Sequence, residues 1–306
     1  MSHELKRRDF LKAGAAMGAA VAFGRKTVFA AEASTVAVVQ GGDYGKATAK
    51  AVELLGGMQG FVRKGSRVAI LANVQSRHPG TFTSPAVLKA AIGLLKGAGA
   101  SAVACLSLQP VKQWEDTGLA GILADEGVEL KLFSSKDESL FKTVAVPGGR
   151  ALTEARILAD LGNYDVLVNM PITKDHAGNK FTGTMKNLMG LNASVSNRSF
   201  HKPNWQTDPD DIAHLDQCIV DLNKVIKPAL NIADATEFIT TNGPFGPGEL
   251  AKPGKVVAGT DRVAVDSVCA RLLGLKPESI IQIVRGAEQG LGEMDPGRIR
   301  IREAKV

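Results

Sequence analysis

The residues with the clearest chemical potential lie in one stretch, "NMPITKDHAGNKFTGTMKNLMG", which runs from Asn169 to Gly190. Lys174 and His176 stand two residues apart, and Lys186 and Asn187 follow later in the same stretch. A cation beside an imidazole can bind a carboxylate or a phosphate, or the two can act as acid and base. The alternative is a solvated loop whose lysines pair with a neighbouring aspartate. Because several such groups occur together, the stretch favours an anion site.

The end of this stretch, "GTMKNLMGL", has the pattern of a short helix, with Thr182 or Thr184 in position to cap its first turn. The free backbone amides and positive end of a helix attract anions. Lys186 would lie about one turn into this helix. We therefore expect a small anionic molecule to be held by Lys174, Lys186 and Asn187.

His201, in "NRSFHKPNW", belongs to the same long connection and is the second candidate acid or base, with His176. A single histidine in a loop is more often a surface residue than a ligand. As a pair, the two imidazoles could bind a divalent metal completed by Asp221 or Asp234. The chain has no His-x-x-x-His or Glu-x-x-His spacing, so the sequence leaves metal binding open.

Asp266 is the candidate carboxylate for orienting a catalytic histidine. It lies on an apolar helix face in "AGTDRVAVDSVCARLLG", four residues after Arg262. Two interpretations have equal support: an ion pair with Arg262 along the helix, or a carboxylate directed at the lysines and histidines. Thr260 or Asp261 is in position to cap the helix, and Asp261 is also a ligand-binding candidate.

Two loops rich in glycine and proline supply the remaining ligand-binding candidates. His78 lies in "SRHPGTFTSP", where a helix cap explains Ser84 but leaves the histidine unexplained. Asn242 lies in "TTNGPFGPGEL", whose glycines could present backbone amides to a ligand. An ordinary wide loop has the same composition. The second loop does not match a dinucleotide fingerprint or a phosphate-binding loop.

Six apolar runs predict the strands that would position these groups. They cover residues 35–40, 67–73, 102–108, 128–133, 165–170 and 255–259. The runs are mostly apolar on both faces, and amphipathic segments such as residues 84–99 alternate with them. The predicted fold is therefore a mostly parallel, doubly wound α/β sheet with helices on both faces. The long connection from Pro171 to Asn204 is predicted to be a functional loop insertion.

Ligands of open parallel sheets bind beyond the C-terminal ends of the strands. Three polar segments begin at such ends here: "NVQSRHPGTFTSP", the stretch after Val168, and "TDRVAVD". Their expected convergence is the main structural reason to predict a site at this edge of the sheet.

The N-terminal residues 1–33 have the features of a twin-arginine (Tat) signal peptide. Lys6-Arg7-Arg8-Asp9-Phe10-Leu11-Lys12 precedes an apolar, Ala/Gly-rich span, and Ala31-Glu32-Ala33 or Val28-Phe29-Ala30 supplies a cleavage site. The span is shorter than the ~20 apolar residues of a membrane-crossing helix. We therefore expect the Tat translocase as a partner during export, no stable membrane insertion after cleavage, and a periplasmic protein in residues 34–306, forming a single α/β domain. The alternative is a basic, Ala-rich first helix.

The distribution of charge supports a local anion site and argues against nucleic-acid binding. Residues 1–33 hold six Lys/Arg and three Asp/Glu, so the chain's net charge of +6 falls to +3 after their removal. Residues 170–205 alone carry five Lys/Arg against one Asp. A long chain with so small an overall charge and few aromatic residues does not predict nucleic acid as a partner.

The three cysteines do not predict a cofactor. Cys105, Cys218 and Cys269 are far apart and have apolar neighbours, and the chain contains no Cys-x-x-Cys. We therefore expect no Cys-ligated iron–sulfur cluster and expect the three thiols to pack as small apolar groups.

Three segments in order resemble the bacterial and archaeal domain of unknown function family 362 (DUF 362). They are "VNMPITKDHAGNKFTGTMKNLMGL", "HLDQCIVDLNKVIKPALNIADA" with the later "TTNGP", and "VVAGTDRVAVDSVCARLLGL". The likeness extends from Val36 to about Ile301. It implies that the family's polar signature falls on Lys174, His176, Lys186, Asn187, His201, Asp221, Asp234, Asn242, Asp261 and Asp266.

This chain also departs from the family pattern. Relatives often have Lys-Pro-Asn where Leu71-Ala72-Asn73 stands here, and an acidic residue where Thr240 or Thr241 precedes Asn-Gly-Pro. Many relatives carry ferredoxin-like cysteines, which this chain lacks. The resemblance thus implies a fold and a site without implying a reaction.

These patterns predict an exported enzyme that acts on a small carboxylate or phosphate. The expected roles are ligand binding by the lysines, acid–base chemistry by His176 or His201, and orientation by Asp266. The alternative is a non-catalytic periplasmic binding protein, or an accessory protein for a redox or metal enzyme, in which the same groups only bind the anion.

Overall fold

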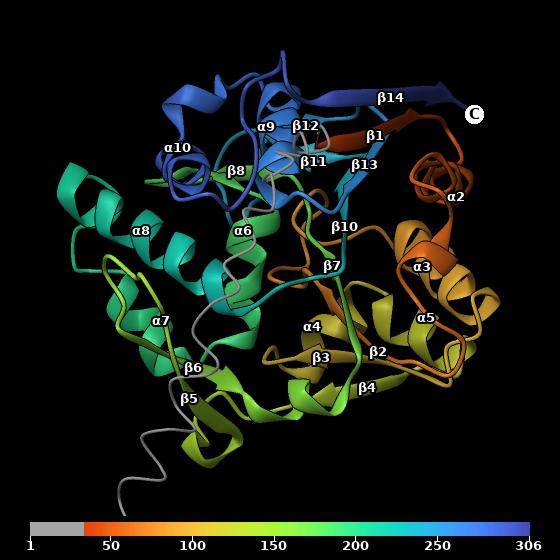
Figure 1. The fold of residues 1–306 in the computed structure, drawn as a ribbon, viewed down its shortest axis with the longest axis horizontal. Coiled ribbons are helices and arrows are strands. Elements are labelled where there is room, and N and C mark those ends of the chain that lie inside the picture. The colour runs from red at the N-terminus through yellow and green to blue at the C-terminus, as the bar shows by residue number, and fades with distance from the viewer. Residues whose placement is uncertain (1–33) are drawn as a thin grey trace, which may run out of the picture. The chain divides into compact units, whose positions relative to one another are not determined.

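The computed structural model describes residues 34–306, so the twin-arginine motif and both cleavage sites lie outside the described residues. The strands of its central sheet are β1 (Thr35–Gln40), β2 (Arg67–Ala72), β3 (Ala102–Ser107), β4 (Glu129–Leu132), β7 (Val166–Met170), β10 (Leu230–Ala235), β13 (Lys255–Gly259) and β14 (Arg300–Lys305). They form an eight-stranded sheet in the order β14-β1-β13-β10-β7-β2-β3-β4 (Figure 1).

All six predicted strands are present, and the sheet is mostly parallel. β10, β7, β2, β3 and β4 pair in parallel, as do β1 and β14. β13 is antiparallel to both of its neighbours. Its C-terminal end therefore lies at the opposite edge of the sheet from the C-terminal ends of β2 and β7. The prediction that residues 260–266 begin at the same edge as the other two polar segments was wrong for this reason.

Helices cover both faces of the sheet, as predicted. One face carries α2 (Tyr44–Leu54), α3 (Pro85–Gly97), α4 (Val111–Asp116) and α5 (Leu119–Asp125). The other carries α6 (Thr184–Asn187), α7 (Ser194–Phe200), α8 (Pro209–Val225), α9 (Arg262–Leu272) and α10 (Ile281–Glu288). Figure 1 shows α2, α3 and α5 on one side of the strands and α8 and α10 on the other. Short 3-10 helices are η1 (Met58–Gly60), η2 (Glu138–Leu140), η3 (Ala159–Asn163), η4 (Leu188–Leu191) and η5 (Pro277–Ser279).

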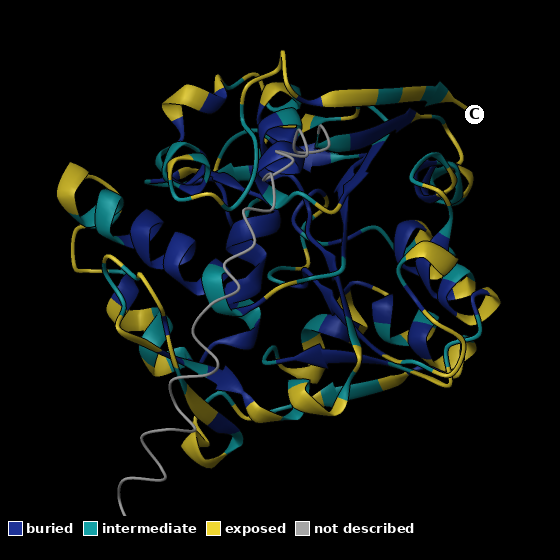
Figure 2. Ribbon diagram, viewed as in Figure 1, coloured by how far each residue is buried: buried dark blue, intermediate teal, exposed yellow. Residues whose placement is uncertain are grey.

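The alternation of side chains along each strand produces two hydrophobic cores. Val36 and Val38 of β1 face the core under α8 and α9, whereas Ala37 and Val39 face the core under α2 and α3. Successive side chains of a strand point to opposite faces, so a strand covered on both sides must be apolar throughout. The central strands are accordingly buried along most of their length (Figure 2).

The connection after β7, predicted as a long loop insertion with a short helix, is largely buried and consists mostly of regular elements. It contains the hairpin β8 (Lys174–His176) and β9 (Lys180–Thr182), then α6, η4 and α7. Two further hairpins pair β5 (Phe141–Ala145) with β6 (Glu154–Leu158) and β11 (Phe238–Ile239) with β12 (Leu250–Ala251). Of the helices in residues 34–306, none has the length and apolar character needed to cross a membrane.

Candidate functional site

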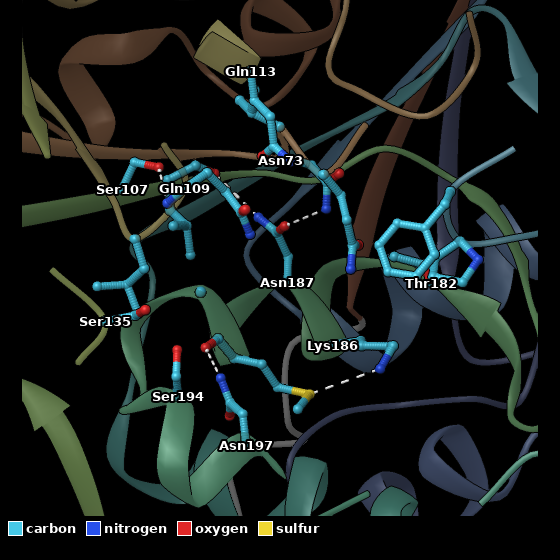
Figure 3. Close-up of a pocket in the computed structure, with 18 of the residues that line it drawn as sticks. Asn73, Ser107, Gln109, Gln113, Ser135, Thr182, Lys186, Asn187, Ser194 and Asn197 are labelled. Carbon is cyan, nitrogen blue, oxygen red and sulfur yellow. Dashed lines mark hydrogen bonds between the residues drawn. The ribbon is translucent and has the colours of Figure 1, made fainter. Parts of the chain in front are cut away.

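A cavity of about 820 Å³ opens beyond the C-terminal ends of β2 and β3, where the connection after β7 crosses the sheet. Figure 3 shows its wall, with side chains from the strand ends on one side and from α6 and α7 on the other. The polar and charged residues that line it are Asn73, Gln75, Ser107, Gln109, Gln113, Ser135, His176, Thr182, Lys186, Asn187, Ser194, Asn197, Arg198 and His201. The predicted position of the site at strand ends therefore coincides with a cavity of ligand-binding size.

The charges around the cavity are of one sign. Lys186 and Arg198 are the cationic side chains of its lining, and no Asp or Glu from the described part of the chain lines it. Arg198 lies on α7, is exposed, and forms no ion pair with residues 34–306. A concave surface with cations and no carboxylate concentrates anions.

Lys186 is the buried cation of this wall. Its side chain projects from the short helix α6, with the residue 8% exposed, and its Nζ is 3.8 Å from Met189 Sδ. Burial lowers the pKa of Lys186 to about 8, and the negative charge of Asp216 opposes this shift. Asp216 is itself buried, which raises its pKa to about 6, and it accepts a hydrogen bond from Asn179. Lys186 forms no salt bridge with residues 34–306 and faces the cavity as an incompletely compensated ammonium group.

His176 and His201 meet across the ring of Trp205. The ring centroid of Trp205 lies 5.3 Å from that of His176 and 4.9 Å from that of His201. Nδ1 of His176 faces the backbone carbonyl of Ala177, and Nδ1 of His201 faces that of Asn197. A carbonyl oxygen only accepts, so each Nδ1 carries the proton and each Nε2 keeps a lone pair. The two predicted histidines are therefore brought together with the same tautomer.

Both imidazoles are neutral near pH 7. Burial and the charge of Lys186 lower the pKa of His176 well below its usual range. The same two causes lower the pKa of His201 to about 4. A neutral imidazole with a free Nε2 can accept a proton, and a bound anion would stabilise the resulting imidazolium.

Lys174, in contrast, does not line the cavity. Its side chain is fully buried and donates to Thr81 O at 2.8 Å and to Asn73 Oδ1 at 3.3 Å. Burial and the charge of Lys186 lower the pKa of Lys174 to about 7. The β8–β9 hairpin directs this lysine toward the loop after β2. Lys174 therefore stabilises the cavity wall by its hydrogen bonds to that loop and does not contact the cavity itself.

Four asparagine amides link the cavity wall to the sheet. Asn73 Nδ2 donates to Asn187 Oδ1 at 2.9 Å, and Asn187 Nδ2 donates to Asn169 Oδ1 at 2.7 Å. Asn169 Nδ2 in turn donates to Asn231 Oδ1 at 3.0 Å. These amides are buried, and such a chain is stable only when its members have partners. It fixes the orientations of Asn73 and Asn187, which both face the cavity.

Asp266 has a different position from the one expected. Its carboxylate accepts from the backbone N–H groups of Thr184 at 2.5 Å and Met185 at 3.0 Å. It therefore occupies the N-terminus of α6, where the sequence suggested Thr182 or Thr184 as caps and an external anion as the occupant. Gly183 permits this approach, because a Cβ there would lie 2.3 Å from Asp266 Oδ1. Asp266 is fully buried and is not part of the cavity lining.

Arg262 does not form an ion pair with Asp266, which was the other interpretation of the sequence. Its guanidinium donates to the carbonyls of Asn223 at 2.9 Å and Ile226 at 2.8 Å. Burial raises the pKa of Asp266 to about 6, although the hydrogen bonds from Thr184 and Met185 oppose the shift. The role of Asp266 in the structure is to hold α6, and through α6 to hold Lys186.

The other three ligand-binding candidates lie outside the cavity lining. Asp261 caps α9 by accepting from Ala264 N at 2.9 Å and also accepts from Glu293 N at 2.8 Å. Asn242 is exposed and left-handed at φ 57°, and its side chain donates to Pro247 O at 3.0 Å. His78 is half-buried and packs its Cβ near Gly246.

The acidic residues considered for a metal site have structural partners. Asp221 accepts backbone hydrogen bonds from residues 150–152, and Asp234 accepts from Ser84 N at 2.6 Å. Residues 34–306 contain no group of three or more His, Cys, Asp or Glu side chains arranged to hold a metal ion.

The cavity also has neutral polar residues that sequence reasoning did not select. Ser107 is the last residue of β3, Gln109 lies just after it, and Gln113 lies in the first turn of α4. The signal was available, because these residues lie at, or shortly after, the C-terminal end of a predicted strand of the parallel sheet. Asn197 was also missed; its side chain holds the carbonyl of Met189 at 2.8 Å and so positions α7 against η4.

Comparisons with known proteins identify the family and a signal sequence. The model of a family described as a domain of unknown function, DUF362, matches residues 68–271. The chain belongs to the DUF362 family. A twin-arginine translocation (TAT) pathway signal sequence matches residues 4–24, so this DUF362 protein carries a signal for export across the cytoplasmic membrane by the Tat translocase.

Cys105, Cys218 and Cys269 of this family member are buried and free, and burial raises their pKa values.

Two individual proteins are similar to this DUF362 chain. It is 28% identical over 249 residues to the thylakoid-associated protein sll1697 of Synechocystis sp., covering 78% of this chain and 73% of that one. The lactate racemase apoprotein of Thermoanaerobacterium thermosaccharolyticum matches with a TM-score of 0.47 and 14% identity. That match covers 82% of this chain, which spans only 56% of the racemase structure.

Proposed function

We propose that this protein is an exported enzyme that binds a small anionic molecule, a carboxylate or a phosphate, in the cavity beside Lys186. The observation that carries the proposal is that the charged side chains with a fixed sign in the cavity lining are positive. Lys186 and Arg198 line the cavity, and the described residues contribute no carboxylate to it. Thr182 adds a buried hydroxyl oxygen that has no hydrogen-bond partner in residues 34–306. An anion would supply the charge and the hydrogen bonds that these groups lack.

The two histidines are the proposed acid and base. Each presents an unprotonated Nε2 because its Nδ1 is held by a backbone carbonyl. His201 is the stronger candidate, because it is only half-buried and lies on the segment that also carries Trp205. In the proposed reaction Lys186 binds the anionic group, and the Nε2 of His201 takes a proton from the adjacent part of the substrate.

A non-catalytic binding protein is the second candidate. The observation that favours it is the absence of a carboxylate behind either imidazole in the described chain, since both are oriented by backbone carbonyls. Such histidines lack the acidic partner that stabilises a transient imidazolium in many acid–base catalysts. Either protein would act in the periplasm, where a signal of this type delivers its cargo.

Native mass spectrometry on the protein purified from its own periplasm tests the anion site. We expect an anionic molecule to co-purify. Lys186→Met should lower the affinity for it about tenfold to a hundredfold, as expected for the loss of one charge-assisted contact, and so reduce its occupancy. Lys180→Met is the matched control, because Lys180 belongs to the same connection and is exposed. Equal occupancy in the two variants would contradict the proposal.

The enzyme and the binding protein are separated by adding the released molecule back. Chemical conversion of that molecule by the protein, lost in His201→Gln while the molecule still binds, supports the enzyme. Binding without conversion supports the second candidate.

A further inference from the structure

The side of the cavity away from Lys186 is lined by uncharged hydrogen-bonding groups. Ser107, Gln109 and Gln113 come from the end of β3 and the start of α4, and Ser135 follows β4. Figure 3 shows Ser107 and Gln109 together on one side of Asn187 and Gln113 above it, whereas Lys186 and Thr182 lie on the opposite side from Ser107 and Gln109. The cavity is therefore divided into a cationic part and a neutral polar part.

The groups of the neutral part have hydrogen-bonding capacity that the protein does not use. Ser107 Oγ accepts from Gln109 N–H and from Trp114 Nε1–H, both at 3.0 Å, so its own O–H remains to donate. Gln113 Oε1 is buried and has no hydrogen-bond partner within residues 34–306. The Gln109 side-chain amide likewise has no partner in the described chain. Buried polar atoms without partners are uncommon, and Gln113 Oε1 is one of them. With the free O–H of Ser107 and the amide of Gln109, it gives this part of the cavity lining unused donors and acceptors.

We propose that the ligand is an anionic carbohydrate, a sugar acid or a sugar phosphate, whose hydroxyl groups contact Ser107, Gln109 and Gln113 while its anionic group lies at Lys186. This inference rests on the proposed anion site and names the chemistry of the rest of the ligand. Hydroxyl and amide side chains both donate and accept, and a hydroxyl group is a ligand function that does the same.

Other ligand types fit this wall less well. An aliphatic tail would desolvate the serine and the two glutamines without replacing their hydrogen bonds, which disfavours its binding. A ligand with a second charged group would find no counter-charge in the neutral part. The volume of about 820 Å³ also exceeds what a small inorganic anion fills, and lies within the range of pockets for larger organic ligands.

Two matched pairs of ligands test the inference by isothermal titration calorimetry with the processed protein. Gluconate is compared with hexanoate, and glucose 6-phosphate with n-hexyl phosphate; sorbitol serves as the neutral polyol. We expect one hydroxylated anion to bind at least about tenfold more tightly than its aliphatic partner, through two or more hydrogen bonds, and sorbitol not to bind. The pair that shows the preference distinguishes a sugar acid from a sugar phosphate.

The variant Gln109→Ala tests whether the preference for the hydroxylated anion arises in the neutral part of the cavity. This variant should reduce the preference for the hydroxylated anion about tenfold and leave the affinity for the aliphatic anion unchanged, whereas Gln59→Ala, at an exposed glutamine, should change neither. Equal affinity within both pairs, or a preference that Gln109→Ala does not alter, overturns the inference and leaves the anion site standing. Failure of all four anions to bind also overturns the inference, whereas the proposed function fails only if Lys186→Met and Lys180→Met retain the co-purifying anion equally.

Discussion

The side-chain amide of Asn73 donates to Oδ1 of Asn187 at 2.9 Å, which joins the residue after β2 to the last residue of α6. Asn73 also accepts from Lys174, and Asn187 also donates to Leu71 O at 3.1 Å. The two amides therefore tie the connection after β7 to the neighbouring strand. Because both residues line the cavity, the hydrogen bond that stabilises the wall also fixes what it presents to a ligand.

Asn187→Ala should destabilise the protein more than a surface asparagine substitution does. The change removes an acceptor for Asn73 and a donor for Asn169 and Leu71, and each buried group left without a partner costs about 1–3 kcal/mol. Urea denaturation of the variant should show a free energy of unfolding lower by at least this amount. Asn204→Ala, at an exposed position, is the control and should lie within about 0.5 kcal/mol of the parent protein.

Asp266→Ala should destabilise the fold and displace Lys186 together. Two backbone N–H groups at the start of α6 lose their acceptor, at a cost of about 1–3 kcal/mol for each group that finds no substitute. The pH dependence gives a second measurement. Because the folded pKa of Asp266 is raised to about 6, the folded state binds more protons than the unfolded state between about pH 4 and 6. This carboxyl group therefore makes stability fall as pH rises through that window.

Asp266→Asn cannot titrate and should lose that fall. Denaturation midpoints of the parent and this variant, compared at pH 4 and pH 7, should show the variant improving relative to the parent at the higher pH. A constant difference across the window would show that Asp266 keeps an ordinary pKa.

The strands were predictable because their signal is local. Runs such as Val36–Val39 are apolar on both faces, and this pattern alone indicates a sheet covered on both sides. The direction of β13 was not predictable in the same way. It depends on pairing between Lys255–Gly259 and the distant β1 and β10, and an apolar run carries no mark of its direction.

The site was predictable only to the level of the segment. Lys174 and Lys186 belong to the same connection, and both were predicted to bind the anion. In the structure Lys174 faces Thr81, whereas Lys186 faces the cavity. The β8–β9 hairpin decides this, through contacts with a loop about ninety residues earlier in the chain. Asp266 is a similar case: its sequence context shows a buried carboxylate, but only the tertiary fold shows that α6 supplies its partners.

Replacing Arg7 and Arg8 by lysine should stop export. The twin-arginine pair is the recognition feature of the signal sequence matched at residues 4–24. We expect precursor to accumulate in the cytoplasm, measured by immunoblotting of cell fractions. The parent protein should be found in the periplasm with an N-terminus near Ser34, read by N-terminal sequencing. Unchanged export of the double variant would contradict the Tat assignment.

His201 should titrate far below the usual range in the free protein. Burial and the charge of Lys186 lower its pKa to about 4, so between about pH 4 and 6.5 the unfolded state binds more protons than the folded state. This histidine therefore makes stability rise with pH through that window, and His201→Gln should flatten the rise. Histidine NMR resonances check the pKa directly, and an anion bound beside the ring should move it upward. A pKa near 6.5 in the free protein would remove the argument for a neutral base.

The affinity for the anion should fall above about pH 8, where Lys186 loses its proton. Burial lowers the pKa of Lys186 to about 8, and that of Lys174, which does not line the cavity, to about 7. Of the two lysines, Lys186 is the one whose charge faces the cavity. A bound anion stabilises the ammonium form, so above the free pKa binding must be accompanied by uptake of a proton. The affinity should then decrease about tenfold for each further pH unit, until the pKa of the bound state is reached. Calorimetric titrations in buffers of different ionisation enthalpy measure that proton directly. Lys186→Met should bind weakly at every pH and take up no proton, whereas Lys180→Met should keep the parent profile. An affinity that stays constant from pH 7 to 10 in the parent protein would exclude Lys186 as the cation that holds the ligand.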